Sequence, residues 1–169
     1  MTRQEYIKKF TSAAIDSTKG TNLFPSLVMA QAIVESANKY GVAGESTLAK
    51  QFNNHFGVKA DPRWKGMKVN LQTREVYDGK SVMVGDYFRV YENPEQSFKD
   101  RNDFLTLNPR YRKAGVFNAT TPEAQAEALQ KAGYATDPNY ANLLKLIIKS
   151  YGLKKLDEAA RKNELPGSV

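Results

Sequence analysis

The feature that most constrains the fold is a single hairpin signal in an otherwise helical pattern. Asp78-Gly79 separates two runs rich in β-forming side chains, at residues 73–77 and 80–84. Glycine, and less easily aspartate, accepts the positive φ angles of a two-residue type I′ turn. Residues 86–91 suit a third strand that continues from the second run. The pattern therefore predicts one small β lobe.

Helical periodicity covers most of the remaining chain. The length of 169 residues is that of one ordinary domain, and no internal repeat is visible. We expect an α+β fold, mainly helical with a small β-hairpin lobe, with one domain over residues 1–152 and a C-terminal amphipathic tail over 153–169. Apolar residues recur at helical spacing in six segments, namely 3–18, 25–40, 94–107, 122–132, 138–151 and 153–165.

The composition excludes several classes of site. With no cysteine, the chain cannot hold disulfides, iron–sulfur clusters, thiolate zinc sites or a cysteine nucleophile. His55 is the single histidine, so a two-histidine metalloprotease site is excluded, and no nucleophile-elbow motif supports a serine triad. We expect His55 to be structural or to contact substrate. The sequence predicts neither a metal nor a cofactor.

The net charge of +7 favours an anionic partner, either nucleic acid or an acidic surface such as a bacterial wall. Acidic residues interleave with the basic ones, which predicts a solvated basic surface that includes Arg101. No aromatic–basic motif supports nucleic-acid binding. No apolar run approaches the roughly 18 residues of a membrane span, so membrane insertion is not expected. The segment Met1–Tyr6 does not resemble a signal peptide.

Glu35 stands out on the helix predicted over residues 25–40. On a helical wheel it lies away from the main apolar arc, yet its neighbours there are uncharged, namely Val28, Gln31 and Ala32. Such half-apolar surroundings would desolvate the carboxyl and raise its pKa, as a general acid at neutral pH requires. The alternative is an exposed Glu35 paired with Lys39, a contact worth about 0.2–0.5 kcal/mol.

Five motifs follow one another in a fixed order, at residues 26–36, 53–59, 88–91, 108–111 and 132–141. Together they resemble the β-N-acetylglucosaminidases of glycoside hydrolase family 73, over roughly residues 4–152. The resemblance implies a lysozyme-like fold in which the hairpin lobe flanks a substrate groove. It also implies an endo-β-N-acetylglucosaminidase that hydrolyses the β-1,4 bond between N-acetylglucosamine and N-acetylmuramic acid in peptidoglycan.

The resemblance assigns two catalytic carboxyls. Glu35 matches the general acid of the family, and Glu75 matches the carboxylate that the family carries on its β lobe. The predicted hairpin register places Glu75 opposite Val82, either at the rim of the sheet or aimed into the groove. A gap of about 6.5–9.5 Å would let Glu75 activate a water with inversion, whereas about 5–5.5 Å would suit a nucleophile and retention. Assistance by the substrate's N-acetyl group is the third alternative, and we favour water activation.

Five further residues are predicted to bind substrate. Tyr134, Thr136 and Asp137 match the family's Tyr-Ala-Thr-Asp motif, whose tyrosine lies in the substrate groove. A tyrosine offers a sugar a flat apolar face and a hydroxyl for hydrogen bonding. From the residues alone, the same stretch also suits a turn in which Thr136 or Asp137 caps a helix. Asn54 and Phe56 belong to the motif at 53–59 and are expected to contact substrate as well.

Rival functions remain open. A lytic transglycosylase or a muramidase would act on the same substrate, and a non-catalytic wall-binding or assembly protein would not need Glu35. We expect a monomer whose partner is the peptidoglycan glycan strand, acting in the periplasm or at the cell wall. Without a signal peptide, delivery is expected through phage lysis, a secretion system or a longer parent protein, and a delivery system or an inhibitor protein is a further expected partner.

Overall fold

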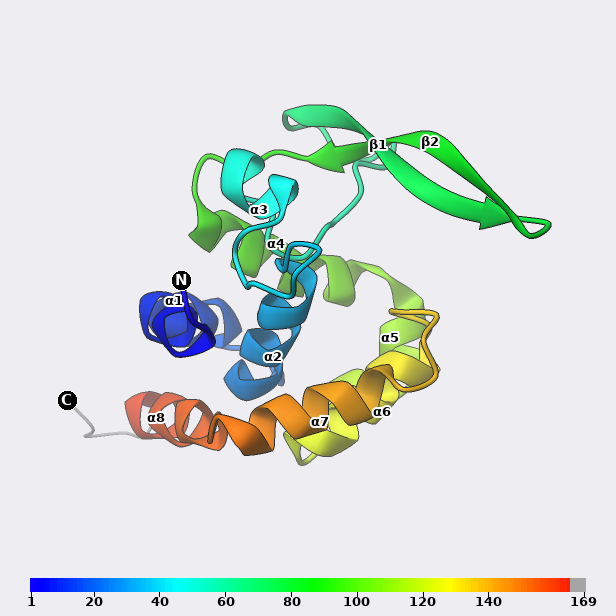
Figure 1. Cartoon of the computed structure of the whole chain (residues 1–169). Coiled ribbons are helices and arrows are strands. Elements are labelled where there is room, and N and C mark those ends of the chain that lie inside the picture. The colour runs from blue at the N-terminus through cyan, green and yellow to red at the C-terminus, as the bar shows by residue number, and fades with distance from the viewer. Residues whose placement is uncertain (165–169) are drawn as a thin grey trace.

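The computed structural model describes the backbone of residues 1–164 and their side chains except those of Glu75, Asn163 and Glu164. Helices form the body of the molecule, and the two-stranded sheet projects from it (Figure 1). In chain order the elements are α1 Arg3–Thr18, α2 Pro25–Glu35, α3 Thr47–Phe52, β1 Lys68–Tyr77, β2 Lys80–Arg89, α4 Pro94–Leu107, α5 Pro109–Lys113, the 3-10 helix η1 Val116–Asn118, α6 Pro122–Lys131, α7 Tyr140–Ser150 and α8 Lys154–Glu164.

Helix α2 lies at the centre of the helical body. It contacts α1, α6, α7 and α8 (Figure 1), and every residue from Pro25 to Ile33 is buried. Its residues are almost all apolar or small, and a helix that is apolar all round is buried all round. The expectation that only one arc faces the core is therefore too narrow, because Val28, Gln31 and Ala32 are also buried.

The predicted end of this helix at residue 40 is wrong, because α2 ends at Glu35. The polar side chains of Ser36 and Asn38, which follow Glu35, form hydrogen bonds with the backbone of the next loop. They do not face solvent on a continued helix, as the prediction required. Ser36 Oγ accepts a hydrogen bond from the Gly44 amide at 2.8 Å, and Asn38 Oδ1 accepts one from the Val42 amide at 3.0 Å. Serine and asparagine compete in this way with helical hydrogen bonding, so Glu35 becomes the last helical residue.

The hairpin has the predicted turn and register. Asp78 and Gly79 have φ angles of 50° and 74°, as a type I′ turn requires, and Glu75 pairs with Val82. Both strands are longer than predicted. Residues 86–89 extend β2 and do not form a separate third strand.

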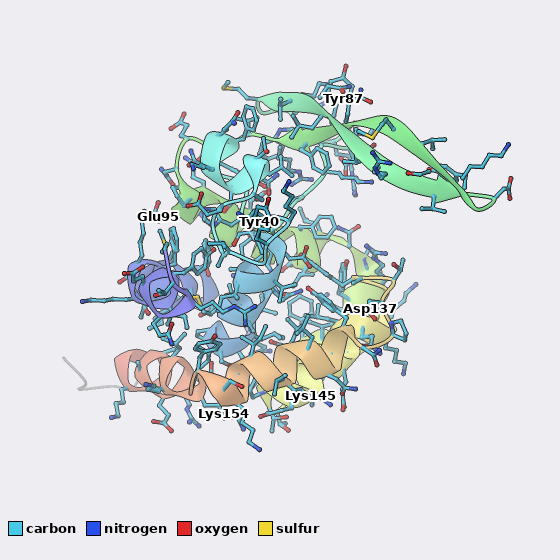
Figure 2. All side chains as sticks on the ribbon, in the orientation of Figure 1. Tyr40, Tyr87, Glu95, Asp137, Lys145 and Lys154 are labelled. Atoms are coloured by element: carbon cyan, nitrogen blue, oxygen red, sulfur yellow. The ribbon has the colours of Figure 1, made fainter. Side chains whose placement is uncertain are left out.

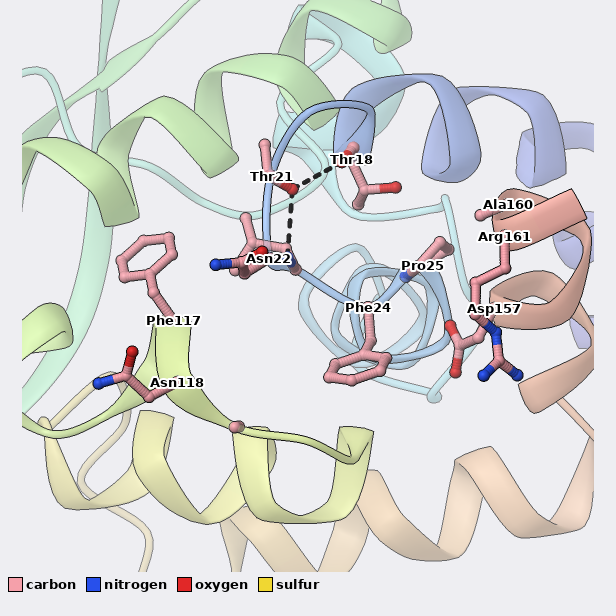
Figure 3. A pocket seen from close by; sticks show the side chains of 12 residues that line it. Thr18, Thr21, Asn22, Phe24, Pro25, Phe117, Asn118, Asp157, Ala160 and Arg161 are labelled. Atoms are coloured by element: carbon pink, nitrogen blue, oxygen red, sulfur yellow. Dashed lines mark hydrogen bonds between the residues drawn. The ribbon is translucent and has the colours of Figure 1, made fainter. Parts of the chain in front are cut away.

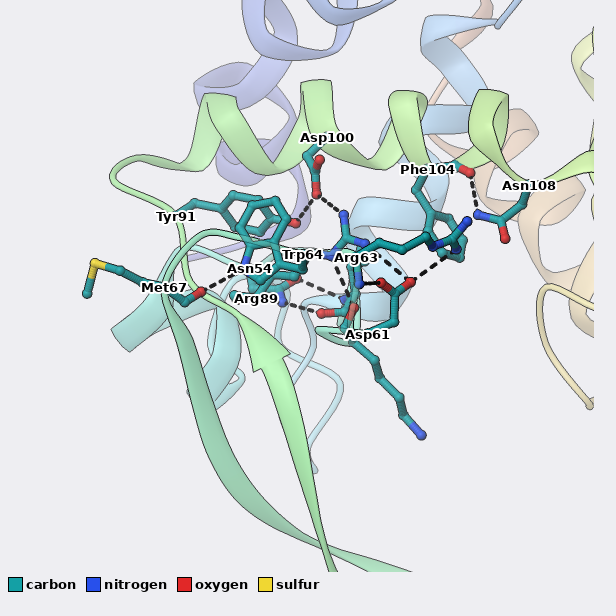
Figure 4. Close-up of polar contacts among 12 residues, drawn as sticks. Asn54, Asp61, Arg63, Trp64, Met67, Arg89, Tyr91, Asp100, Phe104 and Asn108 are labelled. Atoms are coloured by element: carbon teal, nitrogen blue, oxygen red, sulfur yellow. Dashed lines mark hydrogen bonds and ion pairs between the residues drawn. The ribbon is translucent and has the colours of Figure 1, made fainter.

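The base of the hairpin is anchored to the helical body by Arg89, at the end of β2 (Figure 4). Its Nη1 donates to Asp100 of α4 at 2.8 Å, and its Nε donates to the carbonyl oxygen of Lys59 at 3.1 Å. The Tyr91 hydroxyl donates to the same Asp100 oxygen at 2.5 Å. The guanidinium lies over the Trp64 ring, 4.6 Å from its centroid. These contacts fix the base of the β lobe against α4.

Helix α8 packs on the same core as the preceding helices. It contacts α1 and α2, and Leu153 and Leu156 are buried. Asp157 accepts hydrogen bonds from the backbone amide of Ser26 at 2.8 Å and from its hydroxyl at 2.6 Å. The amphipathic helix predicted over 153–165 is thus confirmed for the described residues, while the proposed boundary at residue 152 stays a prediction. Among the described helices, none has the length and apolarity to cross a membrane.

Candidate active site

Glu35 is half-buried at the end of α2, in a position that weakens its acidity. Its Oε1 accepts a hydrogen bond from the Tyr140 hydroxyl of α7 at 2.8 Å. Burial raises the pKa of Glu35, and this effect exceeds the lowering by the Tyr140 hydrogen bond and by the charge of Arg101. The partner of the carboxyl is thus Tyr140 rather than Lys39, and the predicted direction of the pKa shift is confirmed. A carboxyl held in this way can carry a proton nearer to neutral pH than a solvated one.

A chain of buried side chains continues from Tyr140. Its hydroxyl accepts a hydrogen bond from Gln31 Nε2 at 2.9 Å, and Gln31 Oε1 accepts one from Arg101 Nη2. Arg101 is 1% exposed, so the prediction that it belongs to a solvated basic surface is wrong. Its Nη1 donates to Asn102 Oδ1 at 2.9 Å, and the guanidinium is also hydrogen-bonded to the Tyr134 side chain. Side chains from α2, α4, α7 and the loop between α6 and α7 thus form one network that ends at Glu35.

Tyr134 lies between two other tyrosine rings. Its ring stacks on that of Tyr140, with centroids 6.0 Å apart and planes 13° apart, and Tyr111 lies 6.1 Å away on another side. The side chain is half-buried, and its hydroxyl is hydrogen-bonded to Arg101. The structure therefore brings Tyr134 into the same network as Glu35.

Thr136 and Asp137 are exposed in the loop between α6 and α7. Figure 2 labels Asp137 at the surface of this loop. Asp137 Oδ1 accepts a hydrogen bond from the Asn139 amide at 2.8 Å, just before α7 begins at Tyr140. The expected turn is confirmed, but the expected helix cap is wrong, because the N-cap residue of α7 is Asn139 and Asp137 accepts from the amide of that residue instead of from the first turn of the helix. The structure leaves both side chains accessible to a ligand.

Asn54 and Phe56 are buried, which does not fit the expected direct contact with a substrate. Asn54 Nδ2 donates to the carbonyl oxygens of Val58 at 3.0 Å and Arg89 at 2.9 Å. Phe56 is 3% exposed and packs edge-on against Phe98. Because the Asn54 amide is hydrogen-bonded to backbone and the Phe56 ring is packed in the core, these residues anchor the loop before the hairpin to the helical body.

His55 is also structural in its placement. It is 3% exposed, and its Nδ1 shares a 2.6 Å hydrogen bond with the Tyr6 hydroxyl. The Phe10 and Phe98 rings lie 4.9 and 5.9 Å from it. Burial, followed by the charge of Lys9, lowers the pKa of His55 to about 4. The imidazole is therefore neutral at physiological pH and forms part of the aromatic core.

Glu75 lies within β1, opposite Val82, and its side chain lies outside the described part of the structure. The separation of the two carboxyls thus stays a prediction. On the same hairpin Val76, Tyr77 and Met83 are exposed. Exposed apolar side chains on both strands offer a surface for a large ligand.

A separate cavity of about 360 Å³ lies at the other end of α2 (Figure 3). Phe24, Phe117 and Arg161 are among its lining residues. Pro25 lines this cavity and precedes Glu35 by ten residues, which is about 15 Å along the helix at 1.5 Å per residue. The cavity is therefore separate from the site around Glu35. Among the described residues, no group of three or more metal-binding side chains is assembled.

A helical body with a half-buried carboxyl at the end of its central helix, flanked by a small β lobe, defines a lysozyme-like glycosidase domain. The family described as "Glucosaminidase: Mannosyl-glycoprotein endo-beta-N-acetylglucosaminidase" matches residues 11–153. The chain belongs to this glucosaminidase family, glycoside hydrolase family 73.

Three relatives illustrate the similarity. "Peptidoglycan hydrolase FlgJ" of Salmonella typhimurium is 40% identical over 140 residues, covering 80% of this chain and 42% of the relative. "Exo-glucosaminidase LytG" of Bacillus subtilis is 36% identical, covering 81% of this chain and 47% of the relative. The catalytic domain of the autolysin Auto from Listeria monocytogenes superposes with a TM-score of 0.78 at 33% identity, covering 92% of this chain and 87% of that domain. The chain thus spans less than half the length of these two curated relatives.

Sequence reasoning missed three residues of the network, namely Gln31, Arg101 and Tyr140. Gln31 precedes Glu35 by four residues, so the two lie on one face of α2, and this spacing is a usable signal. Arg101 follows Phe98 by three residues and precedes Leu105 by four, so it lies on the apolar face of α4, and this spacing is also a usable signal. Its contact with Gln31 follows only from the packing of α4 against the rest of the body.

Proposed function

We propose that this domain hydrolyses the β-1,4 bond between N-acetylglucosamine and N-acetylmuramic acid in peptidoglycan, with Glu35 as the general acid. The observation that carries the proposal is the burial of Glu35 at the end of α2, which raises its pKa, in a chain of the glucosaminidase family. The printed names of two relatives, a peptidoglycan hydrolase and an exo-glucosaminidase, support the same substrate and reaction.

In this reaction Glu35 donates its proton to the glycosidic oxygen as the bond from that oxygen to C1 of N-acetylglucosamine breaks. Positive charge develops on the sugar ring, and a water molecule attacks C1. Glu75, as the second carboxylate, accepts a proton from that water. The product chain ends in a reducing N-acetylglucosamine. Glu75 then releases its proton to solvent, and Glu35 regains one from solvent for the next cycle.

The loop between α6 and α7 supplies candidate groups for binding the glycan. Tyr134 is half-buried there, and Thr136 and Asp137 offer an exposed hydroxyl and an exposed carboxylate. The positive net charge of +7 favours approach to an anionic wall. Action at the cell wall follows from this substrate. The monomeric state, the delivery route and an inhibitor partner stay predictions.

Glu35→Gln tests the general-acid role most simply, because it keeps size and hydrogen bonding but removes the transferable proton. We expect nearly complete loss of peptidoglycan hydrolysis with an unchanged circular dichroism spectrum. The matched control is Glu127→Gln, an exposed carboxyl on α6. Turnover near the wild-type value in Glu35→Gln would transfer the acid role to another residue.

A further inference from the structure

The hydrogen bonds that lead to Glu35 have a direction, and Arg101 sets it. A guanidinium only donates, so the Gln31 amide must turn its oxygen toward Arg101. Its nitrogen then faces Tyr140 and donates to that hydroxyl at 2.9 Å. With its oxygen occupied as an acceptor, the Tyr140 hydroxyl directs its one proton to Glu35 Oε1 at 2.8 Å.

This direction distinguishes the two oxygens of Glu35. Oε1 accepts the hydrogen bond from the Tyr140 hydroxyl, so the acidic proton of Glu35 resides on Oε2. Building on the proposed general-acid role, we propose that Arg101 is a positioning residue which, through Gln31 and Tyr140, makes Oε2 the proton-donating oxygen and holds the carboxyl at a fixed angle.

Burying the charge of Arg101 without a carboxylate partner among the described side chains costs free energy, which a purely structural role does not explain. It is 1% exposed, and its hydrogen-bond partners in the described structure are the neutral groups of Gln31, Asn102 and Tyr134. Within the same residues its Nε has no partner. A buried charge without a contacting carboxylate costs free energy, because neutral groups replace the water that would solvate it. The cost is understandable if the charge acts on Glu35.

The charged and titratable groups around Glu35 come from three elements. Tyr140 belongs to α7, Arg101 to α4, and Tyr134 to the loop between α6 and α7. Burial raises the pKa of Tyr134 and Tyr140, so both remain neutral in the working range. Arg101 is then the described cation that lowers the pKa of Glu35.

The decisive experiment measures kcat, KM and the pH profile of kcat on a soluble peptidoglycan oligosaccharide for Arg101→Met and Arg101→Lys. In Arg101→Met we expect kcat to fall at least about tenfold, because misplaced catalytic groups lose rate steeply, with KM within about twofold. The alkaline limb of the profile should move to higher pH, because the cation that favours ionised Glu35 is gone. Arg101→Lys should keep the limb near its wild-type position but leave kcat low, because an ammonium cannot serve three acceptors in the same geometry.

Gln125→Met is the matched control. Gln125 is a buried glutamine of α6 whose amide donates to the backbone oxygens of Asn22 and Val116, remote from Glu35. It should lower the melting temperature and leave kcat within about twofold below that temperature. An equal loss of kcat in this control would mean that any buried hydrogen-bond defect slows the enzyme, and would overturn the positioning role.

The inference is also overturned if Arg101→Met keeps kcat within twofold of wild type and leaves the alkaline limb unshifted. If Arg101→Met does not fold, Gln31→Glu decides, because an ionised carboxylate there still pairs with Arg101 but cannot donate to Tyr140. We expect at least about a tenfold loss of kcat at a wild-type melting temperature, and unchanged kcat refutes the relay. Glu35→Gln is assayed in parallel. Activity in that variant contradicts the proposed function, whereas an inactive Glu35→Gln beside a fully active Arg101→Met contradicts the inference alone.

Discussion

Acidification should destabilise this domain through His55, its single histidine. In the folded protein burial lowers the pKa of this imidazole from 6.5 to about 4. Below pH 6.5 the His55 imidazole therefore binds a proton in the unfolded chain but not in the folded protein. The contribution of His55 to the free energy of unfolding is complete above pH 6.5 and is lost as the pH decreases toward 4. At about 1.4 kcal/mol per pKa unit, the loss is about 3 kcal/mol, or roughly 6–12 °C in Tm for a chain of this size.

Urea unfolding of the wild type and of His55→Gln at pH 4, 5.5 and 7 measures this contribution. The variant loses the contact with Tyr6 and should be less stable at pH 7, but the gap between the two proteins should shrink by about 3 kcal/mol at pH 4. Burial raises the pKa of Glu35 and Asp157, which acts in the opposite direction, but both proteins carry these groups. Parallel pH profiles, or a His55 NMR resonance that titrates near pH 6.5 in the folded protein, would show that the folded protein does not disfavour protonation of this imidazole.

Three further predictions follow from the fold and the charge. Asp157→Ala should lower the free energy of unfolding by about 2–4 kcal/mol in thermal or urea melts, because it leaves two buried donors of Ser26 unpaired; the exposed Asp16→Ala serves as the control. Glu75→Gln should lower kcat by about 10²–10⁴-fold with glycan affinity largely kept, and activity within a few-fold of wild type would argue against an essential base. Added salt should reduce activity on whole cell walls more than on short soluble glycans, since screening weakens steering by the net charge of +7; equal sensitivity would remove the steering argument.

Local chemistry made parts of the fold predictable from the sequence. The turn at Asp78-Gly79 fixed the register of the hairpin, because few residue pairs accept two positive φ angles in succession. The first helix, Arg3–Thr18, begins after Thr2, whose side chain accepts a hydrogen bond from the Glu5 amide, so its start is also encoded locally.

Long-range packing decided what the sequence could not show. The residues directly beside Arg101 in the sequence are polar, which favoured a solvated cation, yet the packing of α4 places its guanidinium against Gln31, a residue 70 positions earlier. Asn54 and Phe56 lie in a motif that resembles a substrate-binding segment, but contacts with Arg89 and Phe98 bury them. The family motifs thus predict a site region in which the structure joins Glu35 and Tyr134 through one network, while the division between buried support and accessible surface depended on the folded chain.

The sugar at the new reducing end of digested peptidoglycan shows which glycosidic bond the domain cleaves. After borohydride reduction and mass spectrometry, we expect reduced N-acetylglucosamine at that end, absent from digests with Glu35→Gln. Reduced N-acetylmuramic acid would identify a muramidase, and an anhydro-muramic end would identify a lytic transglycosylase. Either result would contradict the proposed bond specificity, and an undigested wall would contradict the proposal that the domain is a peptidoglycan hydrolase.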